Sequence, residues 1–449
     1  MDLIKENFQK ISEQAKKDSV FVEMLLNGGE SLSIGYQKRK VDKFSSNQTQ
    51  MAGFRVVMGG SQGYAYTENL SLESLLRTYQ EALSSAKMLS TGKTNQKIPV
   101  VSDKASVDSM SDLYVPQEVA MADKMKVAQD LEDLLLKQDA RITSVPYSGF
   151  SEGTSWRRIL NSEGIDREFK QNHYSGYAYA LAKNGEEAKM DGESFVVRDF
   201  KGINAADVVK KAAQKSLAKL GAKKLTTGTY PVVICRETAG SFLGMIENYF
   251  SARAVHESKS LLAGKLGTAI GSPLLTLIDN PLEKNLMAAR PFDSEGSVSK
   301  KTTLIEKGVL RNYLTNLEYS EKMNLPHTSS ASRSATSEMD IGSSNLIVEK
   351  GNNKLEDLLK KYPKVVFLTD INGGMHSGFK SSTGDFSLPG EGFLYENGQN
   401  KGPIDQFVFS GNILEMIKDI EALGDTYCKP HSSTLIPDLL ISKMSFAGA

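Results

Sequence analysis

The segment "MAGFRVVMGGSQGYAYTENLSLESLLRTYQEALSSAKML", residues 51–89, decides the fold of the N-terminal region. Two β-like runs flank the glycine-rich stretch at 59–63, which predicts a hairpin. Residues 71–89 predict an amphipathic helix, because apolar side chains recur there at helical spacing. Ser71 is a suitable N-cap, and Glu73 is favourable in the first turn. The apolar stripe consists of Leu72, Leu75, Leu76, Tyr79, Leu83 and Ala86.

The remaining chain divides by composition into three parts joined by one polar segment. Residues 91–113 are polar and lack a sustained period, which predicts a linker. An N-terminal α/β domain is expected at 1–90, and a central α/β domain, with helix, strands and helix in that order, at 114–224. From 225 to 449 short β-like runs rich in Gly and Ser predict a β-rich domain. The predicted class is α+β, two α/β domains followed by a β-rich C-terminal domain.

The overall charge and the apolar runs exclude several classes of protein. Lys plus Arg (54) equals Asp plus Glu (54), so no global field favours nucleic acid or an anionic membrane. No apolar run approaches the roughly 18 residues of a membrane span, and residues 1–18 are typical of a surface helix, not of a secretory signal. Cys235 and Cys428 offer no disulfide framework. We therefore expect a cytoplasmic protein that binds neither nucleic acid nor membrane.

Two glycine-rich motifs resemble catalytic or phosphate-binding loops. The stretch "GGSQG" at 59–63 fits G-x-S-x-G, but a strand is predicted after it where a nucleophile elbow needs a helix. The stretch "GGMHSGFKSST" at 373–383 has the glycine spacing of a phosphate loop, yet Phe379 occupies the lysine position and a β-like run follows. The first is therefore interpreted as a hairpin turn and the second as a glycine-rich loop.

The stretch "AVHESKSLLAGKLG" at 254–267 begins like a helical zinc-protease motif. His256 and Glu257 would be a zinc ligand and the general base for a metal-bound water. The second histidine of the short motif would fall at Ser260, and that of the longer H-E-x-x-x-H variant at Leu261. Neither spacing is complete, so we expect no catalytic residue here.

Further side chains could complete a divergent metal site. The stretch "CKPH" contains Cys428 and His431, and a thiolate plus an imidazole are good zinc ligands. The alternative to an inactive motif is thus a metalloprotease that uses His256 and Glu257 with Cys428, and with His431 as another ligand. The other histidines are His173, His327 and His376. The sequence does not place these residues near one another, and no metal in this chain remains the first expectation.

Several segments, taken in order, resemble the TldD/PmbA family, also called modulators of DNA gyrase. They are "MAGFRVVMGGSQGYAYTENLS", "SLLAGKLGT", "ARPFDSEGSVSKKTTLIEKGVLRNYLTN", "STGDFS", "GFLYENG" and "SKMSFAGA", and they span nearly the whole chain. The resemblance implies two branches: TldD-type chains carry H-E-x-x-x-H and a C-terminal cysteine as zinc ligands, whereas PmbA (TldE) types lack the motif and act as partners. Aligned on "SLLAGKLG", this chain is similar to the second branch, because Leu261 excludes the second histidine. Cys428 is not carried over as a ligand.

The resemblance also implies a function and partners. Family complexes are similar to cytoplasmic metallopeptidases that trim or degrade unfolded peptides. We therefore expect a homodimer, or a heteromer with a TldD-like subunit that holds the zinc, with no cofactor in this chain. The third interpretation is a non-proteolytic peptide-binding dimer. Despite the gyrase name, no nucleic-acid motif is present.

The glycine-rich segment 372–385 is the expected border of a peptide-binding or subunit cleft. Loops on a rigid sheet commonly carry binding residues. The residues singled out are Asn372, Gly373, Gly374, His376 and Asp385.

Overall fold

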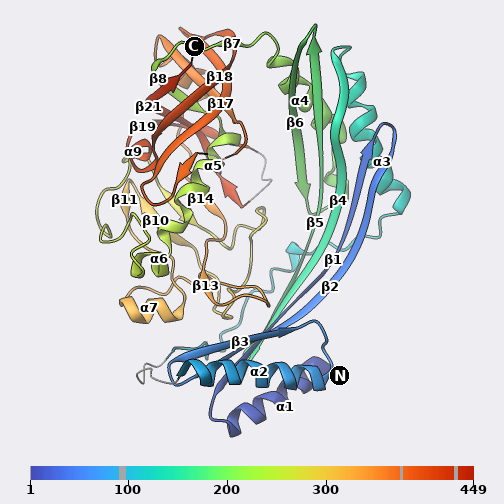
Figure 1. Cartoon of the computed structure of the whole chain (residues 1–449), viewed down its shortest axis with the longest axis vertical. Coiled ribbons are helices and arrows are strands. Elements are labelled where there is room, and N and C mark those ends of the chain that lie inside the picture. The colour runs from blue at the N-terminus through green and yellow to red at the C-terminus, as the bar shows by residue number, and fades with distance from the viewer. Residues whose placement is uncertain (1, 91–97, 375–377, 429–432, 449) are drawn as a thin grey trace.

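The computed structural model describes residues 2–90, 98–374, 378–428 and 433–448 (Figure 1). A six-stranded antiparallel sheet, in the order β3-β2-β1-β4-β5-β6, contains long strands and is called the long sheet below. Its strands are β1 (Phe21–Gln37), β2 (Lys40–Met58), β3 (Ser61–Thr67), β4 (Ile142–Asn161), β5 (Asp166–Asn184) and β6 (Glu187–Val197). The strands come from both sides of segment 91–113, since β1 pairs with β4 from Glu23 opposite Asn161 to Gly35 opposite Gly149. The first two predicted domains thus share one sheet.

Helices cover one face of this long sheet. Near one end lie α1 (Leu3–Lys17) and α2 (Leu72–Ser90), and near the other lie α3 (Met121–Asp133) and α4 (Ala205–Ala218). Short 3-10 turns are η1 (Ser111–Leu113), η2 (Leu135–Lys137) and η3 (Phe200–Gly202). The predicted helix over 71–89 is confirmed as α2, with Ser71 Oγ accepting from Ser74 N at 3.3 Å. The predicted hairpin is confirmed too: Gly59 and Gly60 form its two-residue turn with φ of 53° and 77°, as a type I′ turn requires.

The part of the chain from residue 223 onward, which we call the C-terminal body, is built around a closed five-stranded barrel. Its strands are β8 (Gly228–Ile234), β15 (Lys364–Ile371), β17 (Asp385–Glu396), β18 (Gln399–Asn412) and β21 (Pro437–Ala447). The order is β17-β15-β8-β21-β18, and β18 pairs again with β17, which closes the barrel. At its margins lie β7 (Lys223–Lys224), β16 (Phe379–Lys380) and β19 (Ile420–Tyr427). The prediction of a β-rich C-terminal part is confirmed.

Smaller elements surround the barrel. A five-stranded sheet contains β9 (Leu277–Asp279), β10 (Thr302–Glu306), β11 (Val309–Leu310), β14 (Leu346–Val348) and β20 (Thr434–Leu435), and β12 (Ala331–Ser332) pairs with β13 (Asp340–Ile341). The helices are α5 (Arg236–Ile246), η4 (Glu247–Phe250), α6 (Ala252–His256), α7 (Leu317–Met323), α8 (Leu355–Lys360) and α9 (Ile413–Lys418). Phe242 of α5 packs its ring on Phe386 and Phe409 of the barrel, and so joins α5 to the barrel core. Within the described ranges, no helix is long and apolar enough to cross a membrane.

The C-terminal body docks on the face of the long sheet that the helices leave uncovered. Leu25, Ile159 and Phe169 of the sheet pack there against Ala289 and Phe292 of the body, with the two phenyl rings 5.3 Å apart. Figure 1 shows the body beside the upper part of the sheet, with α1 and α2 below both. The described part of the predicted linker contributes to this same contact. The buried linker residues that join this contact are Val101, Met110 and Leu113.

A buried group of charges completes this docking contact. Arg55 of β2, with 1% of its side chain exposed, lies 3.5 Å from Glu23 of β1 and 3.7 Å from Glu295 of the C-terminal body. Arg333 of the body donates to the other oxygen of Glu23 at 2.6 Å. We call these four residues the charged junction. Because each charge has an opposite charge close by, these four side chains can be buried between the long sheet and the C-terminal body.

Candidate functional site

A hollow of about 760 Å³ opens where the C-terminal body meets α4 and the edge strand β6. We call it the cleft. One wall, from the C-terminal body, is apolar and aromatic; it consists of Leu355, Phe367, Phe393 and Tyr427. Tyr179 of β5 lines the cleft from the side of the long sheet. The other wall carries the charged groups of α4, of β6 and of the turn between β8 and α5. A concave site with an apolar wall and convergent polar groups is the usual form of a ligand-binding site.

Lys219, which follows α4 as its C-cap, joins the long sheet to the C-terminal body across the charged wall. Its ammonium group lies 2.8 Å from Asp191 of β6, 3.1 Å from Asp370 of β15 and 2.9 Å from Glu391 of β17. Burial by itself would lower the pKa of Lys219, but the neighbouring carboxylates outweigh it and raise that pKa above its usual value. Lys219 therefore remains charged and holds three separate strands at one point.

Two further cations, Lys215 and Arg236, form ion pairs at the same wall. Lys215 lies 3.0 Å from Glu193 and 2.9 Å from Glu237. Arg236 binds both carboxylate oxygens of Asp438 through Nε and Nη2, at 3.2 and 2.8 Å, and its backbone N–H donates to the same carboxylate at 2.8 Å. Such a bidentate pair fixes direction as well as charge. The cleft is thus bordered by side chains that are already positioned.

Both cysteines of the chain line the cleft. Cys235 follows β8, and burial raises the pKa of its thiol to about 12. Cys428 follows β19, and burial raises its pKa as well. Thiols of this kind are protonated at neutral pH and are weak nucleophiles. The sequence, in which they stand 193 positions apart (428 − 235), gave no signal that they share a site.

The motif that begins like a zinc-protease helix lies elsewhere. His256 ends α6 and packs edge-on against the ring of Tyr319, with centroids 5.7 Å apart. Glu257 lies 2.7 Å from Lys259 and 2.9 Å from Arg253, and these two cations lower the pKa of Glu257 to about 2. Neither His256 nor Glu257 lines the cleft that Cys428 lines. His431, the other ligand of the divergent-site alternative, lies outside the described residues.

The glycine-rich loop reaches the cleft with its first part. Gly374 lines the cleft, and Asn372 donates at 3.1 Å to Glu391, the carboxylate that also binds Lys219. Gly373 has a positive φ of 72°, so the chain turns there in a conformation that suits glycine. Asp385 begins β17, pairs with Asn412 at 2.9 Å and is not among the lining residues. His376 lies outside the described residues.

A different group of side chains has the geometry to hold a metal ion. Asp293, Glu295 and His327 bring ligand atoms within 4.8 Å of one another, beside the charged junction and away from the cleft. Asp293 already accepts three backbone N–H groups, and Glu295 accepts the N–H of Leu317 and faces Arg55. Burial raises the pKa of both carboxyls. We interpret the group as part of the docking contact; sequence reasoning named His327 but missed both acids.

Comparisons with known proteins cover almost the whole chain. Three family models match in order: domain 1 of the PmbA/TldA metallopeptidases at residues 22–86, their central domain at 114–220 and their C-terminal domain at 227–448. Metalloprotease PmbA of Escherichia coli O157:H7 is 24% identical over 99% of this chain and 96% of its own. A metalloprotease of Methanocaldococcus jannaschii is 25% identical over 93% of this chain and 92% of its own.

Solved structures show the same fold. A proposed modulator of DNA gyrase from Bacteroides thetaiotaomicron superposes with a TM-score of 0.87 and 26% identity over the full length of both chains. TldE from Thermococcus kodakarensis superposes with a TM-score of 0.85 and 18% identity, over 98% of this chain and 100% of its own. At this low identity the second likeness establishes the fold alone.

Proposed function

Because the chain belongs to the PmbA/TldD metallopeptidase family, we propose that it is a PmbA/TldE-like subunit of a cytoplasmic peptidase complex. In this proposal the complex processes unfolded peptides, and the catalytic zinc is held by a TldD-like partner. The subunit assembles either with that partner or with a second copy of itself. Relatives named metalloproteases, among them a TldD homologue, support a common proteolytic context.

The observation that carries the proposal is that Glu257 is held as a carboxylate by two ion pairs. A general base works best when its pKa lies near the working pH and when it reaches the proton it removes. Lys259 and Arg253 instead hold Glu257 as a stable carboxylate with a pKa of about 2. His256 packs on Tyr319, away from the cleft. These contacts support a structural role for both residues in α6 and the turn after it.

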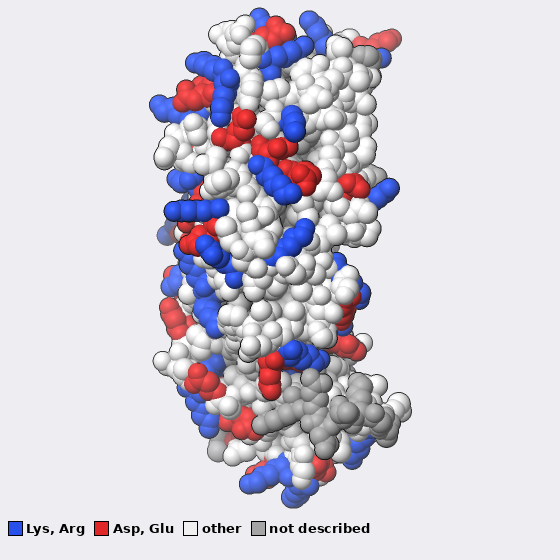
Figure 2. Space-filling model, turned by 90° about the vertical axis from the view of Figure 1, so that its left-hand side faces the viewer, with Lys and Arg blue, Asp and Glu red and all other residues white. Residues whose placement is uncertain are grey.

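The cleft is the part of the chain that we assign to the peptide. Its apolar wall suits side chains of an unfolded segment, and its paired charges offer hydrogen bonds to a backbone without demanding one sequence. Figure 2 shows positive and negative side chains interspersed over the visible face of the C-terminal body, without a broad basic area. The whole chain has as many Lys and Arg residues (54) as Asp and Glu residues (54), so no overall field favours a nucleic acid as ligand.

We predict that His256→Ala and Glu257→Gln leave the peptidase activity of the reconstituted complex within about twofold of wild type, as expected for surface substitutions outside a catalytic site. The measurement is release of fluorescent fragments from fluorescein-labelled, unfolded casein by the complex with its TldD-like relative. Lys418→Ala, which removes another exposed ion pair of the C-terminal body, is the matched control. A loss of tenfold or more in Glu257→Gln alone would instead support the divergent metalloprotease.

A further inference from the structure

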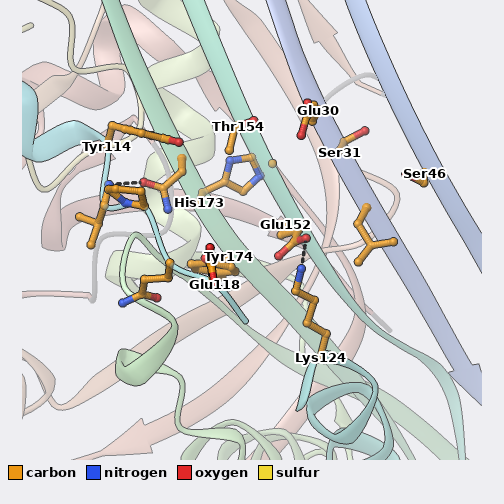
Figure 3. A pocket seen from close by; sticks show the side chains of 16 residues that line it. Glu30, Ser31, Ser46, Tyr114, Glu118, Lys124, Glu152, Thr154, His173 and Tyr174 are labelled. Carbon is orange, nitrogen blue, oxygen red and sulfur yellow. Dashed lines mark hydrogen bonds and ion pairs between the residues drawn. The ribbon is translucent and has the colours of Figure 1, made fainter. Parts of the chain in front are cut away.

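A second hollow, of about 600 Å³, lies on the helix-covered face of the long sheet beside α3 (Figure 3). We call it the sheet pocket. Strands β1, β2, β4 and β5, the segment 114–118 and α3 contribute its walls. It has no lining residue in common with the cleft. The proposed function makes no use of it.

Negative charge is in excess around the sheet pocket. Glu30, Glu118 and Glu152 line it, and Lys124 is the one lysine among the lining residues. Lys124 is bound to Glu152, as Figure 3 shows by a dashed line. Glu118 has neither a hydrogen bond nor an ion pair with any residue that the structure describes, and Glu30 receives only a long hydrogen bond, 3.4 Å, from Gln48. Two carboxylates thus face the pocket without a cation.

Tyr174 presents a hydroxyl to the same pocket. Its side chain is 6% exposed, and its ring packs against Phe150 and Phe200 with centroids 6.4 and 5.4 Å away. Tyr174 stands opposite Glu152 in the β4–β5 ladder, so both side chains point to the pocket face. Within the described parts of the chain the hydroxyl has no hydrogen-bond partner, and it is not among the buried side-chain atoms that are both unpaired and closed off from solvent. It therefore opens to the pocket and is available to a ligand.

We propose that the sheet pocket binds an alkylammonium or guanidinium group. Glu118 and Glu30 supply the opposite charge, and the Tyr174 hydroxyl oxygen accepts a hydrogen bond from the cation. Burial and the charge of Glu152 raise the pKa of Tyr174, so its hydroxyl stays neutral and keeps lone pairs to offer. The ring of Tyr114 adds an aromatic wall of the kind that favours organic cations. The group belongs either to a lysine or arginine side chain of a peptide or to a free polyamine.

Isothermal titration of the full-length protein at low salt tests this site with three probes. They are spermidine, an acetylated five-residue peptide with one central lysine, and the same peptide with glutamine in place of lysine. We expect spermidine, the lysine peptide or both to bind, and the glutamine peptide not to bind. Binding of the lysine peptide alone identifies a peptide side chain as the ligand, and binding of spermidine alone identifies a free polyamine.

Variants that keep the fold make the test specific. Tyr174→Phe retains the ring in the core and removes only the hydroxyl, and Glu118→Gln retains the shape of the side chain. Each should raise the dissociation constant about tenfold, the effect of losing one charge-assisted contact. Tyr66→Phe and Glu186→Gln, exposed and outside the pocket, should leave it unchanged. Failure of both cationic probes to bind, or equal binding by wild type and both pocket variants, overturns the proposal while leaving the proposed peptidase role untouched.

Discussion

Replacing Arg55 by alanine is expected to lower the free energy of unfolding by about 3–5 kcal/mol, the usual effect of removing one partner from a buried ion pair. Arg55 is enclosed between the long sheet and the C-terminal body and faces two carboxylates, Glu23 and Glu295. Without the guanidinium, Glu23 keeps Arg333, but the facing oxygen of Glu295 loses its cation. The loss therefore combines a cavity with a buried carboxyl that must either stay charged without its cation or take up a proton.

Urea-induced unfolding measures this loss, and Arg77→Ala is the matched control. Arg77 also pairs with a glutamate, Glu81 at 3.9 Å, but 72% of its side chain is exposed, so its removal should cost no more than about 0.5 kcal/mol. In the double variant Arg55→Ala with Glu295→Gln, the stranded charge is gone, and the loss should be smaller than the sum of the two single losses by about 1 kcal/mol. If Arg55→Ala costs no more than Arg77→Ala, the charged junction does not hold the two bodies together.

The second large effect is expected for Gly63→Ala, which should destabilise the protein by about 2–3 kcal/mol through overpacking. A Cβ atom at Gly63 of β3 would lie 2.0 Å from the backbone oxygen of Ala82 and 2.4 Å from the backbone nitrogen of Ala86, both in α2. Backbone atoms inside a helix cannot move aside as a flexible side chain can. The hairpin and α2 would have to separate, and the core between them would open.

Gly244→Ala is the control for this substitution. Gly244 lies in α5, and a Cβ atom there would meet nothing within 4 Å. Alanine has the better helix propensity, so this variant should be neutral or more stable by up to about 1 kcal/mol. Thermal unfolding of the two variants beside wild type makes the comparison. Equal stability of Gly63→Ala and wild type would mean that β3 does not pack on α2 as closely as described.

The parts of the fold that sequence reasoning predicted are those with local causes. The Gly59–Gly60 turn and the apolar stripe of α2 depend on residues a few positions apart, and both are confirmed. The pairing of β1 with β4 joins Glu23 to Asn161, and no local pattern encodes it. The barrel likewise closes through β17 and β18, after strands far apart in the chain have come together. Its β-rich character was predicted, but its closure was not.

The candidate sites divide in the same way, into those that lie within one segment and those that distant residues form together. Sequence reasoning could compare the zinc motif position by position, because Ser260 and Leu261 stand four and five residues after His256. In the structure α6 ends at His256, and the absence of zinc from this chain stays a prediction. Sequence reasoning could not find the cleft, where Lys219 meets carboxylates from three strands. The sheet pocket had no signal either, since it draws its walls from separate strands, a loop and a helix. Convergence of distant polar residues is a property of the folded sheet, not of any one segment.

The most direct test of the central claim is hydrolysis of unfolded, fluorescein-labelled casein with zinc present. Three preparations are compared at equal molar concentration: this chain alone, its TldD-like relative alone, and the two together. We expect no zinc-dependent hydrolysis by this chain alone and a rate for the mixture at least about tenfold above that of the relative alone, the gain expected when a partner positions the substrate. Zinc-dependent hydrolysis by this chain alone, at the rate of the mixture and abolished by Glu257→Gln, would contradict this expectation.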